Sequence, residues 1–154
     1  MLPKSSTDVY LEQDREFLEQ IPQTKYLSLN GLKVLVVDNN EDCLCIITFL
    51  LEDYQAQTKS AISVDEAIEA IEEWKPDIVL SDIAMPYKDG YSLIRSIRQK
   101  EVLEGGFLPA VAITSYVHTE VLIKVINAGF QELIPKPFEA DELVAILVKL
   151  TRGT

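Results

Sequence analysis

The sequence predicts an α/β protein in which a doubly wound, five-stranded parallel sheet carries helices on both faces. From Lys33 onward, short apolar runs of strand length alternate with amphipathic runs of helical length, which is the pattern of a parallel sheet covered by helices. The chain has 154 residues, of which 47% are hydrophobic, and this suffices for one domain with its own core. Five strand–helix repeats are too few for an eight-stranded barrel, so an open sheet is favoured.

The expected strands are short and mostly apolar. Ile78, Val79 and Leu80 are the clearest case, because an uninterrupted apolar run is typical of a strand buried on both faces. Such a sheet is of the flavodoxin-like type, with strand order 2-1-3-4-5 and with its sites at the carboxyl ends of the strands. The predicted strands comprise residues 33–38, 56–59, 77–82, 109–114 and 131–134.

Capping signals mark several of the expected helices. Ser63 followed by Glu66 forms a capping box at the start of the second helix. Gly129 ends the fourth helix, because glycine tolerates the left-handed conformation that often closes a helix. The predicted helices comprise residues 41–53, 63–74, 90–100, 118–128 and 139–150.

Residues 1–30 do not follow the strand–helix rhythm and are predicted to form an N-terminal extension to the main domain, residues 31–154. Residues 8–21 place apolar side chains at helical spacing after a Ser-Ser-Thr cap, and Pro22 ends the run. We expect one helix and a connector in this extension. A poorly ordered tail, or a linker from a longer protein, is the alternative.

Composition and charge narrow the classes of function. The net charge of −11 and the pI near 4.5 argue against direct binding of nucleic acid or of an anionic membrane, since both reward clustered lysine and arginine. The N-terminus lacks the apolar region of a signal peptide and no apolar run reaches membrane-spanning length, so we expect a cytoplasmic location. Cys43 and Cys45 fit neither a Cys-x-x-Cys site nor a disulfide framework and are interpreted as reduced thiols.

Polar side chains follow the carboxyl ends of four expected strands: Asp38 with Asn39, Asp82, Thr114 and Lys136. Carboxylate and amide oxygens suit Mg²⁺, and a divalent cation would relieve the repulsion between the two aspartates. The hydroxyl and the ammonium are groups that hold an oxyanion. An oxyanion beside a metal-bound aspartate indicates a phosphoryl group carried by that aspartate.

Four motifs, each weak alone, occur in a specific order along the chain. They are residues 34–42 (VLVVDNNED), 80–90 (LSDIAMPYKDG), 112–114 (AIT) and 128–138 (AGFQELIPKPF). On these motifs, about four fifths of the chain, from about Leu32 to Leu150, resembles the receiver domain of two-component response regulators.

The resemblance implies that Asp82 accepts a phosphoryl group from a phosphohistidine on a partner histidine kinase or histidine phosphotransfer domain. It also implies that Asp38 and Asp82, with the backbone carbonyl of Ala84, bind Mg²⁺. Asn39 stands where the family usually has a second acidic residue, and it can offer a carbonyl oxygen to the metal without a charge. We therefore expect weaker Mg²⁺ binding and slower phosphorylation than in a receiver with two acids at this place.

In the same family, Thr114 and Lys136 would contact the phosphoryl oxygens, and the peptide bond from Lys136 to Pro137 is typically cis. Tyr116 lies where the family places a residue that borders the phosphoryl group. With the small Ala84 it would form a gate to that group; simple surface packing of Tyr116 is the alternative.

Leu133 occupies the position at which the family typically carries an aromatic side chain that moves inward on phosphorylation. A leucine cannot report phosphorylation by that ring movement. Asn39 and Leu133 therefore keep a second hypothesis open, a pseudo-receiver that binds partners with weak or no phosphorylation.

Two other classes of protein fit less well. Haloacid-dehalogenase-like phosphatases need a second aspartate two residues after the nucleophile, where this chain has Ala84, so no enzyme activity is expected beyond the chain's own phosphorylation and dephosphorylation. The acidic run 38–42 would repel the phosphate that a flavodoxin binds after its first strand. We expect output through protein–protein contacts; the downstream partner, a homodimer, and an origin as a stand-alone regulator or as part of a hybrid kinase stay open.

Overall fold

The computed structural model describes residues 28–152 of the chain. Its strands are β1 (Lys33–Val37), β2 (Gln57–Ala61), β3 (Ile78–Asp82), β4 (Ala110–Thr114) and β5 (Glu132–Pro135). They form one parallel sheet in the order β2-β1-β3-β4-β5. The predicted doubly wound sheet of the flavodoxin-like type is confirmed.

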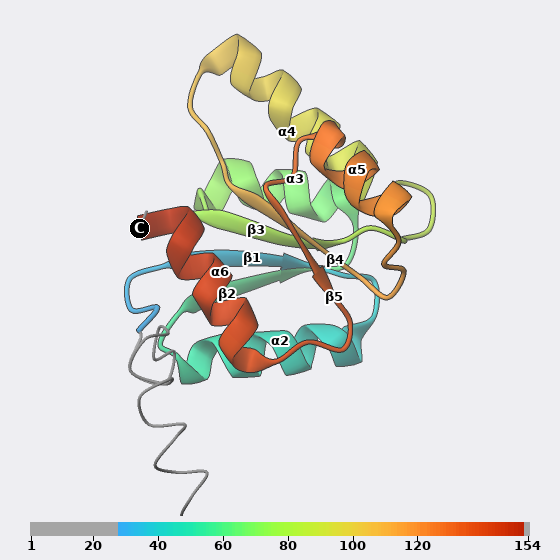
Figure 1. Cartoon of the computed structure of the whole chain (residues 1–154). Coiled ribbons are helices and arrows are strands. Elements are labelled where there is room, and N and C mark those ends of the chain that lie inside the picture. The colour runs from blue at the N-terminus through green and yellow to red at the C-terminus, as the bar shows by residue number, and fades with distance from the viewer. Residues whose placement is uncertain (1–27, 153–154) are drawn as a thin grey trace, which may run out of the picture.

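Helices cover both faces of this sheet, as predicted. They are α2 (Glu41–Asp53), α3 (Val64–Trp74), α4 (Gly90–Glu104), α5 (Thr119–Ala128) and α6 (Ala140–Arg152). Figure 1 shows α2 and α6 on one face of the sheet and α3, α4 and α5 on the other. The helix predicted over residues 8–21 lies outside the described residues.

The alternation of side chains along β1 explains why this strand is apolar throughout. Val34 and Val36 pack in the core beneath α2 and α6, whereas Leu35 and Val37 pack in the core beneath α3, α4 and α5. All four side chains are at most 1% exposed. A strand covered on both faces needs apolar residues at every position, and its polar residues are therefore displaced to its ends.

Most element boundaries agree with the prediction to within one residue, and the larger differences are at the ends of α4, β2 and α6. Helix α4 continues beyond Lys100 to Glu104, and it ends at Gly105, whose left-handed backbone (φ 84°) lets its N–H donate to the Glu101 carbonyl at 2.7 Å. Strand β2 runs over residues 57–61 rather than 56–59. It is an edge strand with largely exposed side chains, so no apolar pattern marks its ends.

The core of the described part reaches slightly beyond the expected start of the main domain at residue 31. Leu29 is fully buried, and its N–H donates to the carbonyl of Tyr54 at 2.7 Å. None of the helices within residues 28–152 is long and apolar enough to cross a membrane.

Candidate functional site

The carboxyl edge of the sheet brings together three charged side chains from three different strand ends. Asp38 directly follows β1, Asp82 is the last residue of β3, and Lys136 directly follows β5. The Lys136 ammonium lies 2.9 Å from Asp38 Oδ2 and 3.7 Å from Asp82 Oδ1. Because parallel strands end at one edge, residues nearly a hundred positions apart in the sequence become neighbours.

Asp38 is held rigidly at this edge. Its side chain is only 3% exposed, and both carboxylate oxygens accept hydrogen bonds, Oδ1 from the backbone N–H of Asn40 at 2.9 Å and Oδ2 from Lys136. Its own N–H donates to the Ala61 carbonyl at 3.1 Å, so β2 positions it as well. A buried carboxylate with both oxygens bonded is fixed in orientation.

Asp82 is less enclosed, with 12% of its side chain exposed. Burial raises the pKa of its carboxyl above the ordinary value, and the negative charge of Asp38 raises it further; the Lys136 ammonium and the backbone N–H groups of Ile83 and Ala84 lower it in part. Of the two aspartates, Asp82 is therefore the one with accessible and incompletely neutralised oxygens.

Lys136 links the two carboxylates. Burial by itself would lower the pKa of its ammonium, but the hydrogen bond that it donates to Asp38 and the charges of Asp82 and Asp38 outweigh burial and raise the pKa. Its backbone N–H donates to the Thr114 carbonyl at 2.8 Å, and the following bond to Pro137 is cis. The lysine therefore carries its charge throughout the physiological range.

Thr114 ends β4 at the same edge and is 3% exposed. Its Oγ1 accepts a hydrogen bond from the backbone N–H of Tyr116 at 3.1 Å, so the hydroxyl proton remains available for another acceptor. The Tyr116 side chain itself is 66% exposed and stands outside the cluster. The structure thus ties the backbone of Tyr116 to the site, whereas its ring faces solvent.

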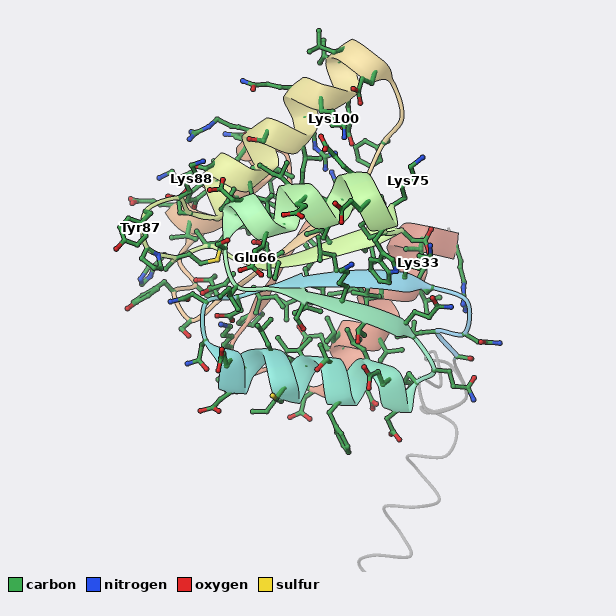
Figure 2. All side chains as sticks on the ribbon, turned by 180° about the vertical axis from the view of Figure 1, so that it is seen from behind. Lys33, Glu66, Lys75, Tyr87, Lys88 and Lys100 are labelled. Atoms are coloured by element: carbon green, nitrogen blue, oxygen red, sulfur yellow. The ribbon has the colours of Figure 1, made fainter. Side chains whose placement is uncertain are left out.

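The loop after β3 depends on a close approach by Gly90. A Cβ on this residue would lie 2.6 Å from the carbonyl oxygen of Asp82 and 2.9 Å from Cα of Ile83. The Gly90 N–H donates to the Ile83 carbonyl at 2.9 Å, which closes the loop. Tyr87 and Lys88 project from this loop at the end of the molecule opposite Lys33 (Figure 2). Glycine is therefore needed to hold Asp82 at the tip of its strand.

Three further predicted site residues lie around the cluster. Asn39 and Ala84 are exposed at the carboxyl edge, and within residues 28–152 the Asn39 carboxamide makes no hydrogen bond. Leu133 is partly buried against the core beneath α3, α4 and α5, in register with Ala112. Asn39 therefore has free polar atoms at the site, whereas Leu133 is a packing residue in this state.

Sequence reasoning missed two residues that shape the site. Asn40 donates its backbone N–H to Asp38, and its side-chain Oδ1 caps α2 by accepting from the N–H of Cys43 at 3.1 Å. Asn40 stands directly before an acidic first helical turn, and this N-cap pattern could have identified it from the sequence. Gly90 was read only as part of a motif, because a close backbone approach leaves no trace in the sequence beyond the glycine itself.

The donor set fits a hard divalent cation. Asp38, Asp82 and Lys136 together carry one net negative charge, and the nearby unused donors are oxygens of Asp82, of the Asn39 amide and of backbone carbonyls. Mg²⁺ prefers such oxygens and retains several waters, so few protein ligands suffice. Among residues 28–152, no group of three or more His, Cys, Asp and Glu side chains is placed so that it could hold a metal ion.

The fold and this edge place the chain in the class of open α/β proteins whose sites form at the carboxyl ends of parallel strands. The family model of the response regulator receiver domain matches residues 34–148. The chain therefore belongs to the response regulator receiver domain family.

Related proteins and structures agree with this assignment. An uncharacterised 14.6 kDa protein from the sodA1 3′ region of Leptolyngbya boryana is 34% identical over 120 residues, 78% of this chain and 90% of that protein. The sensor histidine kinase GacS of Pseudomonas protegens is 32% identical over 81% of this chain, which spans 14% of GacS. The Francisella response regulator 1452 receiver domain matches with a TM-score of 0.73 and 28% identity, covering 79% of this chain and 98% of that one.

Proposed function

We propose that the chain is a phosphorylatable receiver in which Asp82 takes a phosphoryl group from a phosphohistidine on a histidine kinase or histidine phosphotransfer domain. The observation that carries this proposal is the difference between the two aspartates. Asp38 is buried and bonded at both oxygens, whereas Asp82 is partly exposed and faces a lysine at 3.7 Å without bonding to it. A nucleophile needs such a free oxygen with positive charge nearby.

In the proposed transfer, a carboxylate oxygen of Asp82 attacks the phosphorus atom of the phosphohistidine. A P–O bond forms as the P–N bond breaks, and the leaving imidazole takes up a proton. Lys136 would hold negative charge on the phosphoryl oxygens, and the free hydroxyl proton of Thr114 would donate to one of them. Both groups lie at strand ends of one sheet, so the fold holds them near Asp82 before the transfer.

Mg²⁺ is the proposed cofactor, held by Asp38, Asp82, the backbone carbonyl of Ala84 and, through its amide oxygen, Asn39. When bound it would neutralise charge on the phosphoryl oxygens and on the two carboxylates. Asn39 and Ala84 are both exposed, which supports the access of a hydrated ion to them. Lys136 would then exchange its bond to Asp38 for contact with the phosphoryl group.

The proposed setting is a cytoplasmic phosphorelay. The phosphodonor is a histidine kinase or phosphotransfer domain, and output runs through contacts with a downstream protein that neither fold nor charge identifies. The net charge of −11 disfavours direct contact with nucleic acid or an anionic membrane, and no turnover of an external substrate is proposed.

The competing hypothesis, a pseudo-receiver, rests on Asn39 and Leu133. Incubation with acetyl phosphate or beryllofluoride and Mg²⁺, followed by intact mass and peptide mapping, decides between the two. We expect one adduct, located on Asp82 and absent from Asp82→Asn. Asp65→Asn, which changes an exposed aspartate on α3, is the matched control and should be modified like the wild type. A wild-type chain that stays unmodified would establish the pseudo-receiver.

A further inference from the structure

The outer surface of α2 carries an apolar groove that the described residues leave uncovered. Its volume is about 620 Å³. Ile46 is 63% exposed and Phe49 is 77% exposed, although both are large apolar side chains. The groove, called the α2 groove below, is lined by Cys45, Ile46, Phe49, Leu50, Asp53, Tyr54 and Ala140.

Helix α2 is apolar on two sides. One side buries Leu44, Ile47 and Leu51 against the sheet, as a covering helix must. The other side places Ile46, Phe49 and Leu50, spaced three and four residues apart, along the groove. A helix that covers a sheet needs only the first stripe, so the second one indicates a contact with something else.

The chain leaves the described part next to one end of this groove. Leu29 donates its N–H to the Tyr54 carbonyl at 2.7 Å, and the Ser28 hydroxyl donates to Gln55 Oε1 at 2.7 Å. Arg152 also donates to the Ser28 carbonyl. Tyr54 itself lines the groove, so the residues that precede Ser28 start beside it and on the same face of the sheet.

The preceding sequence has the pattern and the length to fill the groove. Residues 8–21 carry an apolar stripe at helical spacing, made of Tyr10, Leu11, Phe17, Leu18 and Ile21. As a helix, the distance from residue 11 to residue 21 is about 15 Å, and the distance along α2 from Cys45 to Tyr54 is about 14 Å. The connector 22–27 can span up to about 20 Å, and it starts beside Leu29, which bonds to the groove residue Tyr54.

We propose that residues 8–21 of this chain dock along the α2 groove as a helix, with Ile21 near Tyr54 and Leu11 near Cys45. The apolar stripe of the segment then covers Ile46 and Phe49. This contact places a piece of the chain itself across the outer surface of α2.

Charge gives this docking a distinctive signature. Residues 8–21 contain five acidic residues and one arginine, and α2 contains four acidic residues and no basic one. The two elements repel each other at long range and attract only through their apolar faces. Salt should therefore strengthen the docking by screening, whereas it would weaken the binding of a basic partner helix.

The other exposed apolar clusters are poorer places for the segment. One of them, on α5 (Leu122, Ile123 and Ile126), lies on the opposite face of the sheet from α2. Val102, Leu103 and Phe107 are 63–85% exposed, but they belong to α4 and the loop after it, on the opposite face of the sheet. Ser28 is joined to the α2 face by Leu29, which is buried in the core beneath α2 and α6. The segment reaches the α2 groove without crossing an edge of the sheet.

Cys45 supplies a native probe, because it is exposed in the described part and lines the groove. The full chain is alkylated with N-ethylmaleimide under native conditions, and the rate at Cys45 is followed by peptide mass spectrometry. We expect Leu11→Gln with Leu18→Gln to raise this rate roughly tenfold, which corresponds to the loss of about 1.4 kcal/mol of docking. The rate at Cys43, which does not line the groove, should stay unchanged.

The matched control changes the neighbouring residues with the same spacing. Glu12→Gln with Glu19→Gln introduces the same side chain on the polar side of the segment and lowers the repulsion, so Cys45 should be protected as well as or better than in the wild type. Equal rates in the wild type and in the leucine variant would overturn the proposal.

A reciprocal test starts from the groove. Hydrogen exchange of the full chain should show residues 8–21 protected in the wild type and at least about fivefold faster in Phe49→Gln. Val102→Gln, which replaces an equally exposed residue on α4, should leave the protection intact. Protection that vanishes on dilution would show docking onto a second copy, and faster exchange in both variants would show a nonspecific effect; either result would overturn the proposal.

Discussion

Lys136 donates to Asp38 and not to Asp82, although it lies between them: its Nζ is 2.9 Å from Asp38 Oδ2 and 3.7 Å from Asp82 Oδ1. The ammonium thus neutralises the aspartate that is already buried and bonded. The other aspartate keeps a raised pKa and oxygens that face the opening of the site. One lysine therefore distinguishes the two carboxylates, because it fixes Asp38 by a hydrogen bond and leaves the oxygens of Asp82 without one from its ammonium.

Replacement of Lys136 by methionine should destabilise the fold and raise the pKa of Asp82. Removing one partner of a buried ion pair costs roughly 3–5 kcal/mol, and the partial exposure of Lys136 puts the expected loss at the lower end. The pKa of Asp82 should rise further, because the lysine is the main group that lowers it. Urea unfolding and carboxyl NMR titration measure the two effects.

The control for this variant is Lys149→Met. Lys149 pairs with Glu132 at 2.7 Å, but 58% of its side chain is exposed, so its loss should cost about 0–1 kcal/mol. Equal losses for the two variants would contradict the role assigned to Lys136.

Asp82→Asn should change how stability depends on pH. The folded carboxyl has a pKa above its ordinary value of 3.8, so the folded state holds this proton more tightly than the unfolded chain. In the wild type, the contribution of Asp82 to the free energy of unfolding therefore falls as pH rises from about 3.8 through the raised pKa. The stability of the variant relative to the wild type should rise over that window and stay constant above it.

Chemical denaturation at a series of pH values provides the check for Asp82. Asp65→Asn, on the exposed surface of α3, corrects for the loss of one unit of overall charge. A stability difference that does not grow with pH would show that burial does not raise the pKa of Asp82 in the folded state.

Asn39→Asp should strengthen Mg²⁺ binding. The new carboxylate would stand at the exposed mouth of the site, and one added charge near a divalent ion is worth on the order of 1–2 kcal/mol there, about tenfold in affinity. Asn40→Asp adds the same charge one residue later, but that side chain is committed to capping α2 and should have a smaller effect. Calorimetric titration with Mg²⁺ compares the three proteins. Equal affinities would show that the lack of a charge at Asn39 does not weaken Mg²⁺ binding.

Gly90→Ala should displace the loop that carries Ala84. The added methyl would meet the Asp82 carbonyl oxygen at 2.6 Å, and such overpacking against backbone costs about 1–3 kcal/mol. Gln99→Ala introduces the same residue at an exposed position of α4 and should be nearly neutral. Thermal unfolding gives the cost, and amide shifts of residues 83–89 show the displacement; a stable variant with unchanged shifts would refute the close approach.

Arg98→Lys should not be conservative. The Arg98 guanidinium donates to the carbonyls of Gly129 and Leu108 and to Glu101, and it stacks 4.4 Å from the centre of the Phe107 ring. A lysine ammonium cannot donate to all of these acceptors at once, so we expect a loss of about 2 kcal/mol in the free energy of unfolding. Arg95→Lys is the matched control, because Arg95 is also an arginine of α4 but its side chain is exposed. It should cost less than about 0.5 kcal/mol in the free energy of unfolding.

The fold was predictable because its signals are local and repeated. Uninterrupted apolar strands such as β3 and the helix caps at Ser63 and Gly129 recur along the chain, and each can be recognised from a few residues. The edge strand β2 was misplaced by one to two residues because its exposed side chains carry no such pattern. The end of α4 was missed because Gly105 could equally have belonged to the loop.

For the candidate site, the sequence predicted which side chains lie at the same edge of the sheet. It did not predict the distances between them. The positions of Asp38, Asp82, Thr114 and Lys136 after strands already implied one edge of the sheet. Which aspartate the lysine bonds depends on side-chain packing and on the backbone N–H of Asn40, and no sequence pattern encodes these distances. The roles of Asn39, Leu133 and Tyr116 stay predictions.

Arg152, at the end of α6, binds the carbonyls of Ser28 and Asn30, so the two ends of the described part meet. Their meeting point lies at the amino edge of the sheet, away from Asp82. A folded unit whose ends touch can be inserted into a loop of another protein, or cut and rejoined in a new order, without strain on its core. Insertion of this domain between two others would therefore leave the carboxyl edge of its sheet, with Asp82, uncovered.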